Sequence, residues 1–115
     1  MDKLRNQVSI NLAGEERIMR ASFTAIRAIE TALGKSIVAV INQIGQQGDL
    51  SFTDAATIIH HGLRGNQDTR LSLDDVGDAV LDEGLGNASV AVVEFLSIAL
   101  NGVTVGKPVE PETAR

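Results

Sequence analysis

Residues 58–65, IIHHGLRG, hold both histidines of the chain side by side and an arginine between two glycines. Metal-binding helices space their histidines four residues apart, so that both rings reach one ion. The neighbours His60 and His61 should instead project to opposite flanks of the apolar stripe on this helix. That stripe consists of Ala55, Ile58, Ile59 and Leu63. We therefore expect two partly exposed histidines, no metal site, and Gly65 as the left-handed cap that ends the helix.

Two other stretches imitate binding motifs and lack the residues that the motifs need. LGKS at 33–36 ends in the Gly-Lys pair of a phosphate loop, but Ile29 stands where the loop needs its first glycine. The segment NQDTRLSLDDVG at 66–77 is as rich in Asn and Asp as a calcium loop. It has Leu71 where that loop turns at glycine and Gly77 where it needs a bidentate Glu. Neither motif is complete, and we predict no cofactor.

The sequence contains no convincing candidates for a catalytic acid, base or nucleophile. The acidic residues crowded into 74–83 are interpreted as a solvated face, because nothing in the pattern predicts the burial that tunes a catalytic carboxyl. The sequence has no cysteine and no G-x-S-x-G segment around a nucleophilic serine. We therefore expect a protein that is not an enzyme.

The charge and the apolar segments of the chain limit the classes of partner that it can bind. The net charge is −5, with a net +2 over residues 1–35 and −7 over residues 36–115. An acidic chain is a poor ligand for nucleic acid, whereas halves of opposite charge favour self-association or a basic partner, with an ordinary solvated surface as the alternative. The start of the chain has no apolar signal segment, and the apolar stretch at 88–100 is too short to span a membrane. These features predict a cytoplasmic protein that forms homo-oligomers.

The elements that would position these residues are a hairpin and short helices. Alternation over residues 7–12 predicts a strand, AGEE at 13–16 a turn, and RIMRA at 17–21 the returning strand. Four serines are expected to cap the helices that follow: Ser22, Ser36, Ser51 and Ser72. Aromatics make up 3 % of the residues, so a core of Ile, Leu, Val and Ala favours packed helices. The predicted fold is α+β, mostly α: a β-hairpin on four to five helices, in one domain over residues 1–102. A flexible Pro- and Glu-rich tail is expected over residues 103–115.

The last predicted helix begins at Asn87 as its N-cap and runs to Leu100. Apolar residues fall on nearly all its sides, although a chain of 115 residues can rarely surround a helix completely. We expect the face with Val90, Val93, Leu96 and Leu100 to lie on the chain's own core. The opposite face is then predicted to meet another copy or a partner helix, with the alternative that the hairpin and the first helix bury it. Its candidate partner-binding residues are Val92, Phe95, Ile98 and Ala99.

The order of these elements resembles the gene-transfer-agent and phage tail assembly chaperones over residues 6–102. The strand pair QVSINLAGEERIMRAS, the helix phrase with Phe23, Ile29, Glu30, Leu33 and Gly34, and the later GLRG at 62–65 contribute most to the likeness. LSFTDAATIIHHGLRG and LSLDDVGDAVLDEGL follow in the same order. The specificity comes from order and spacing, because each phrase alone is ordinary helix sequence.

This resemblance implies a non-enzymatic assembly chaperone that binds the helical tape measure protein and keeps it soluble in the producing bacterial cell. Tail tube subunits would then replace it, so that it would be absent from the mature particle. The alternatives are a minor structural tail or head–tail connector protein and an unrelated helical adaptor or antitoxin-like regulator. The family supplies no catalytic residues to transfer, and no residue-level binding motif.

Overall fold

The computed structural model describes residues 6–48 and 50–102, so the tail predicted over 103–115 lies outside the described residues. Strands β1 (Gln7–Leu12) and β2 (Glu15–Arg20) are followed by five helices. The helices are α1 (Phe23–Leu33), α2 (Ile37–Gln47), α3 (Phe52–Gly65), α4 (Leu73–Glu83) and α5 (Leu85–Asn101). The predicted α+β, mostly α architecture with an N-terminal hairpin is confirmed.

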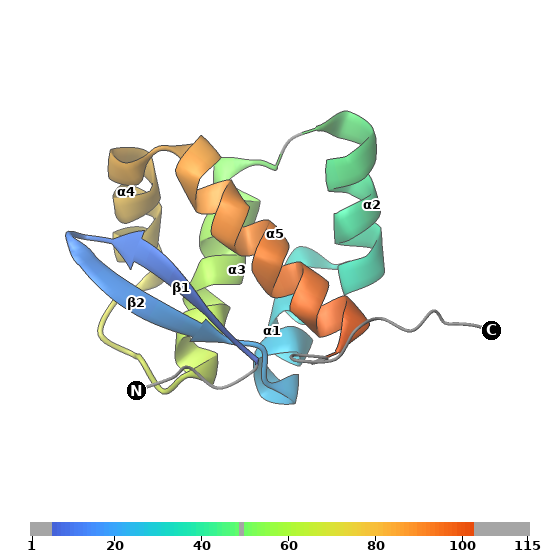
Figure 1. Cartoon of the computed structure of the whole chain (residues 1–115), viewed down its shortest axis with the longest axis horizontal. Helices are drawn as coiled ribbons and strands as arrows, with labels where there is room; N and C mark the ends of the chain where they lie inside the picture. The colour runs from blue at the N-terminus through green and yellow to red at the C-terminus, as the bar shows by residue number, and fades with distance from the viewer. Residues whose placement is uncertain (1–5, 49, 103–115) are drawn as a thin grey trace, which may run out of the picture.

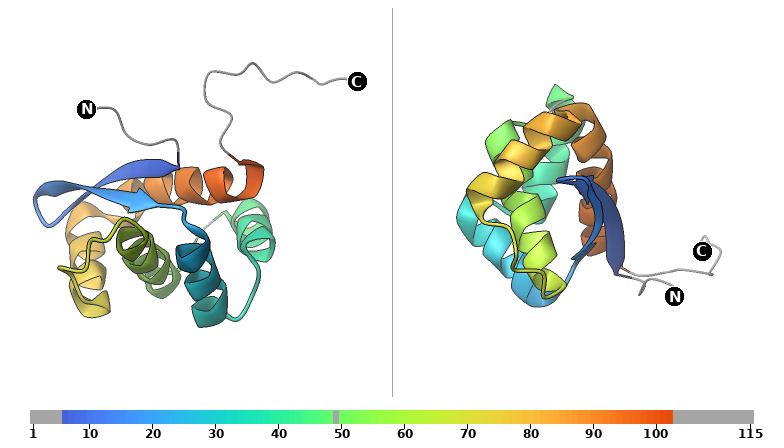
Figure 2. Two further views of the ribbon diagram at one scale, coloured as in Figure 1. Left: turned by 90° about the horizontal axis from the view of Figure 1, so that it is seen from below. Right: turned by 90° about the vertical axis from the view of Figure 1, so that its left-hand side faces the viewer.

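The described elements form two layers around α3. Helix α3 packs on α1, α4, α5 and β2, and its stripe of Ala55, Ile58, Ile59 and Leu63 is buried as predicted. The hairpin and α5 form the second layer, which covers the other helices from one side (Figures 1 and 2). Aliphatic side chains dominate the core. The largest fully buried side chain of all is the aromatic ring of Phe95.

Each of the four predicted serine caps is present. The hydroxyls of Ser22, Ser36 and Ser51 accept hydrogen bonds from the backbone three residues later, at 3.0–3.1 Å. Ser72 forms a complete capping box with Asp75, because each side chain accepts from the other residue's backbone N–H at 3.1 Å. The first-turn donors of these helices are thereby satisfied locally.

The hairpin turns more tightly than predicted. Glu15 already belongs to β2, which leaves a two-residue turn in which Ala13 (φ 54°) and Gly14 (φ 78°) are both left-handed. Two positive φ angles define the turn type that matches the twist of paired strands. The predicted turn over 13–16 was therefore too long.

Arg17 ties the hairpin to the α3–α4 connection. Its guanidinium is buried and donates to the Asp68 carboxylate at 3.3 Å, the Glu15 carboxylate at 3.2 Å and the Leu12 carbonyl at 3.4 Å. Arg70 also donates to Asp68, at 3.0 Å. This hydrogen bond, more than any other cause, lowers the pKa of Asp68 to about 2. The carboxylate stays charged and holds Arg17 in place.

Gly65 does not end α3 in a left-handed cap, and that prediction is wrong. It is the last residue of α3, the C-cap is Asn66, and the positive φ falls on Gln67 at 67°. A Cβ on Gly65 would collide with the Arg20 carbonyl oxygen and lie 3.0 Å from the Ala25 Cβ. Glycine is needed here because α3 approaches the β2–α1 junction closely.

The start of α5 also differs from the prediction. The helix begins at Leu85, with Gly84 as its N-cap, and Asn87 lies in its first turn. The Asn87 side-chain amide donates to the Glu83 carbonyl at 2.8 Å, at the end of α4. Of the described helices, none is long and apolar enough by itself to span a membrane; α4 and α5 satisfy that test only as a pair bent by 118°.

Candidate functional site

An apolar groove runs between α2 and α5. Its main hollow has a volume of about 390 Å³ and is lined by Ile44, Gly48, Leu50, Ser89, Val90 and Val93. A second hollow of about 40 Å³ shares Ile44 and Val93 with it and adds Ile41, Leu96 and Ser97. We call both together the α2–α5 groove. None of these lining residues is charged, so the groove offers a partner apolar contact.

The sequence of α2 forms one wall of the groove. This helix contains no charged residue, begins at the Ser36 cap and ends at Gly48, whose φ is 76°. Ile37 and Val40 anchor the helix in the core. Ile41 and Ile44 are only partly buried, since α2 packs on α5 and α1 and has no further helix on its outer side. Part of the apolar surface of α2 is thereby left to line the groove.

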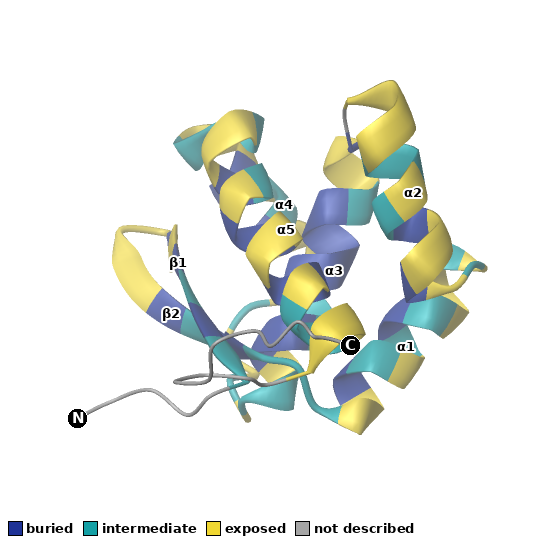
Figure 3. Cartoon of the chain, turned by 45° about the vertical axis from the view of Figure 1, so that its right-hand side comes forward, coloured by how far each residue is buried: buried dark blue, intermediate teal, exposed yellow. Residues whose placement is uncertain are grey.

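Helix α5 forms the other wall and carries the most exposed apolar residue of the groove. Val90 is 71 % exposed and Val93 is 43 % exposed. Farther along α5, Leu100 is also exposed, at 47 %. Figure 3 shows buried and exposed bands side by side along this helix. Single exposed aliphatic residues are common, but here they adjoin a groove, which is the usual form of a binding surface.

The faces of α5 differ from the prediction, although Leu96 is buried as predicted. Val92 and Phe95, predicted to lie on the partner-facing side, are fully buried in the chain's own core, and Ile98 and Ala99 are half-buried against it. The expectation that this face is exposed is therefore wrong. Strand β1 and helices α3, α2 and α4 pack on α5, so the alternative of burial within the chain applies, with the hairpin among the elements that cover the helix.

Sequence reasoning missed the groove residues because it placed Val90 and Val93 on the core side. Four of the five polar residues of α5 could have shown the correct side. At 100° per residue, Asn87, Glu94, Ser97 and Asn101 fall within an arc of about 80°, and Ser89 lies outside it. Val90 lies inside that arc and Val93 lies next to it. The buried residues occupy the opposite half of the helix.

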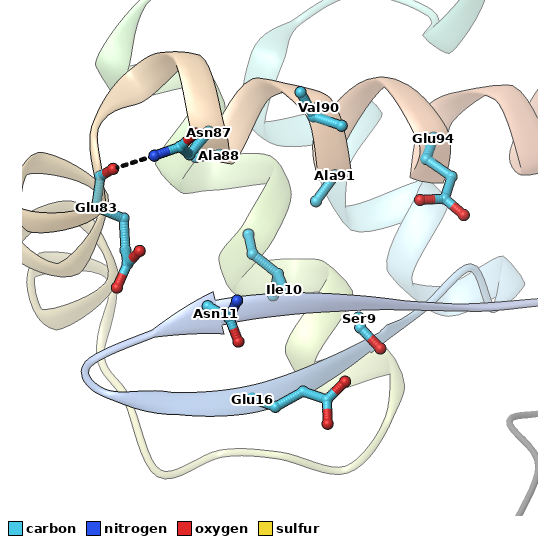
Figure 4. A pocket seen from close by; sticks show the side chains of 10 residues that line it. All are labelled: Ser9, Ile10, Asn11, Glu16, Glu83, Asn87, Ala88, Val90, Ala91 and Glu94. Atoms are coloured by element: carbon cyan, nitrogen blue, oxygen red, sulfur yellow. Dashed lines mark hydrogen bonds between the residues drawn. The ribbon is translucent and has the colours of Figure 1, made fainter.

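A second, polar hollow of about 420 Å³ separates the hairpin from α5. Figure 4 shows carboxylates entering it from three elements: Glu16 from β2, Glu83 from α4 and Glu94 from α5. Asn11 and Asn87 complete the polar rim, above a floor that includes Ile10 and Ala91. Across the described residues, no three His, Asp or Glu side chains are placed to hold a metal ion. The three carboxylates therefore give this hollow its negative charge without forming a coordination site.

The histidine pair is partly exposed, as predicted, but the two rings do not point to opposite flanks. Their centroids are 5.2 Å apart in an edge-to-face arrangement, and Arg64 donates to the His60 ring at 3.3 Å. Burial lowers the pKa of both histidines, and the Arg64 charge adds to the effect. The neutral forms are favoured at pH 7.

The fold and the groove define the class: a small, mostly helical α+β domain with an uncharged groove between two of its helices. The family model described as "Phage tail tube protein, GTA-gp10" matches residues 5–102, and the chain belongs to this family. No curated protein and no solved structure matches it. The expected tail-related family of phages and gene transfer agents is confirmed. The description of the family is that of a structural tail protein and names neither an enzyme nor a chaperone.

Proposed function

We propose that this protein acts without catalysis in the assembly of a phage-like tail, by holding a helical segment of the tape measure protein in the α2–α5 groove. The observation that carries the proposal is the groove itself, open to solvent between two helices and lined without a charge. The tape measure protein as partner comes from the resemblance to tail assembly chaperones.

An amphipathic helix is the ligand that such a groove suits. Its apolar residues at i, i+3 or i+4, and i+7 form one stripe, which can contact Ile44 on one wall and Val90 and Val93 on the other. Long tape measure helices expose such stripes before assembly, and covering them would prevent aggregation. The protein would act in the cytoplasm of the producing cell, leave when tail tube subunits take its place, and be absent from the finished particle.

A structural role is the second candidate, favoured by the family description as a tail tube protein. In that case the protein itself would remain in the tail, and the groove would bind a neighbouring subunit. Mass spectrometry of purified particles separates the two roles. Stoichiometric amounts of the chain in the particle would contradict the chaperone role and support the structural one.

The groove is tested by co-expressing the full chain with the tape measure protein of the same particle. We expect wild-type chain to keep the tape measure protein soluble and to co-purify with it. Val93→Asp places a charge in the groove at a partly exposed position and should weaken this binding at least tenfold while the chain stays folded. Val38→Asp is the matched control, since Val38 is 49 % exposed on α2 and does not line the groove.

Three results would contradict the proposal. Unchanged binding by Val93→Asp would place the partner elsewhere on the chain. Equal losses in Val93→Asp and Val38→Asp would show that the charge itself, and not its place in the groove, weakens binding. An insoluble tape measure protein in the presence of wild-type chain would argue against a chaperone altogether.

A further inference from the structure

A second apolar hollow, of about 430 Å³, lies between α3 and α4, away from the α2–α5 groove. Phe52, Leu73 and Leu81 line it while remaining 44 %, 43 % and 62 % exposed. Thr53, Ala56 and Gly77 complete its floor, and Asp74 and Asp78 stand on its rim. We call this hollow the acidic socket.

The charges of the socket have no salt-bridge partner within the described part of the chain. Asp74 and Asp78 are exposed, lie four residues apart on α4 and repel one another mildly. The salt bridges of the described residues all lie in the Arg17–Asp68–Arg70 region, so none of them involves these two carboxylates. An apolar side chain accompanied by a cation would satisfy both the floor and the rim of the socket.

The outer face of α1 presents such a pair. Phe23 is 76 % exposed, the highest value among the large exposed hydrophobic residues. The Arg27 guanidinium lies 6.0 Å from the centre of its ring, at the limit of a cation–π contact. Arg27 is exposed and takes part in none of the salt bridges between described residues. We call Phe23 and Arg27 the aromatic knob.

One copy cannot place its own knob in its own socket. The knob lies near the C-terminal end of α3, because Gly65 touches Ser22 and Ala25 at the start of α1. Phe52 and Thr53, at the N-terminal end of α3, belong to the socket. In the left view of Figure 2, α4 and α1 lie on opposite sides of α3. The two surfaces therefore cannot meet within one copy, and the contact between them needs a second copy.

We propose that copies of this chain associate head to tail, with the aromatic knob of one copy in the acidic socket of the next. The knob is basic and aromatic, and the socket is apolar and acidic, so the two surfaces of one sequence complement each other. Aromatic and arginine side chains in a central pocket contribute most of the energy of many interfaces. Such a contact uses two different patches, and repetition therefore gives a ring or a filament.

The test uses complementary broken surfaces. Phe23→Ser removes the knob and leaves the socket, whereas Leu81→Asp disables the socket and leaves the knob. Sedimentation of wild-type chain over a concentration series should show oligomers larger than a dimer. Each variant alone should sediment as a monomer, with association weakened at least tenfold. An equal mixture of the two should form a dimer and nothing larger, because only one intact knob can meet one intact socket.

The control and a second variant pair keep the test decisive. Val38→Ser changes another exposed apolar residue and should associate like wild type. Arg27→Asp and Asp78→Arg should each weaken association, and the two changes combined in one chain should restore it. Monomeric wild-type chain at every concentration would overturn the proposal. So would a mixture of Phe23→Ser and Leu81→Asp that gains no dimer, since a symmetric interface or another partner would then explain the two surfaces. Phe23→Ser and Leu81→Asp both leave the α2–α5 groove unaltered, so each of these two variants should still bind the tape measure protein.

Discussion

Gly65→Ala should destabilise the protein, although alanine is the better helix former. In an exposed helix, this exchange stabilises by about 0.5–1 kcal/mol. At Gly65, however, the new Cβ would meet the Arg20 carbonyl oxygen and come within 3.2 Å of the Ser22 hydroxyl. Overpacking of this kind costs about 1–3 kcal/mol. Because the obstructing atom belongs to the backbone at the β2–α1 junction and cannot rotate away, we take the upper end and expect a net loss of about 2 kcal/mol.

Two other helical glycines are matched controls. Gly45 lies in α2, and a Cβ added there would meet no atom within 4 Å, so Gly45→Ala should stabilise by about 0.5–1 kcal/mol. At Gly62, a Cβ would lie 3.0 Å from the Met19 Cβ and 3.1 Å from the Met19 Cγ and Sδ. The Cγ and Sδ can rotate away, whereas the Cβ moves only with the backbone of β2. Gly62→Ala should therefore fall between the other two variants.

Urea unfolding followed by circular dichroism measures this order directly. The unfolding midpoint should rise for Gly45→Ala and fall most for Gly65→Ala, with unchanged slopes. If Gly65→Ala were as stable as Gly45→Ala, α3 would not approach the hairpin as closely as described. That result would contradict the close packing of α3 on the β2–α1 junction.

Four further changes test separate parts of the structure. Ala13→Asn should stabilise by about 0.5–1 kcal/mol in urea unfolding, because alanine is strained at φ 54° and asparagine is favoured in this turn. Ser72→Ala should cost about 1 kcal/mol by the same measurement, since it removes a capping box. The pKa of Asp68 is lowered to about 2, so its charge stabilises the fold above pH 4 and that contribution is lost as the pH falls toward 2. Asp68→Asn should therefore be less stable than wild type at pH 7, and thermal unfolding should show the gap closing at pH 2. The lowered pKa of His60 and His61 means that protonation favours the unfolded chain, so stability falls below pH 6.5. Replacing both with Gln should reduce that loss and leave the unfolding temperature at pH 7, with or without zinc, nearly unchanged.

Local features were predicted well because the residues that determine them are close in sequence. Each serine cap depends on one hydroxyl and a backbone N–H three residues later, and all four caps are present. The strand over residues 7–12 follows from strict alternation, and its apolar members are buried. Such patterns need no knowledge of the tertiary fold.

The role of Gly65 could not be predicted from the residues around it in the sequence. A glycine near the end of a helix is most simply interpreted as a left-handed cap, and the sequence around it supports that interpretation. The actual requirement is the approach of the Arg20 carbonyl, 45 residues earlier in the chain. No local pattern contains that contact, and α3 includes the glycine as its last residue, with Asn66 as the C-cap.

The predicted partner-binding residues and the α2–α5 groove share one helix but lie on different faces of it, and one physical fact explains both results. A helix as apolar as α5 must be covered on most sides, so its sequence indicates that more than one layer packs on it. Which side of α5 faces the core depends on two free-energy costs: that of exposing its bulkiest apolar residue and that of burying its few polar residues. Phe95 has by far the largest apolar surface on α5, and Glu94 carries its only charge. With Phe95 inward, Glu94 and Ser97 point to solvent, and the valines beside them are exposed next to α2. The α2–α5 groove is therefore a consequence of burying Phe95, and a substitution that turned this helix would remove the groove along with the core.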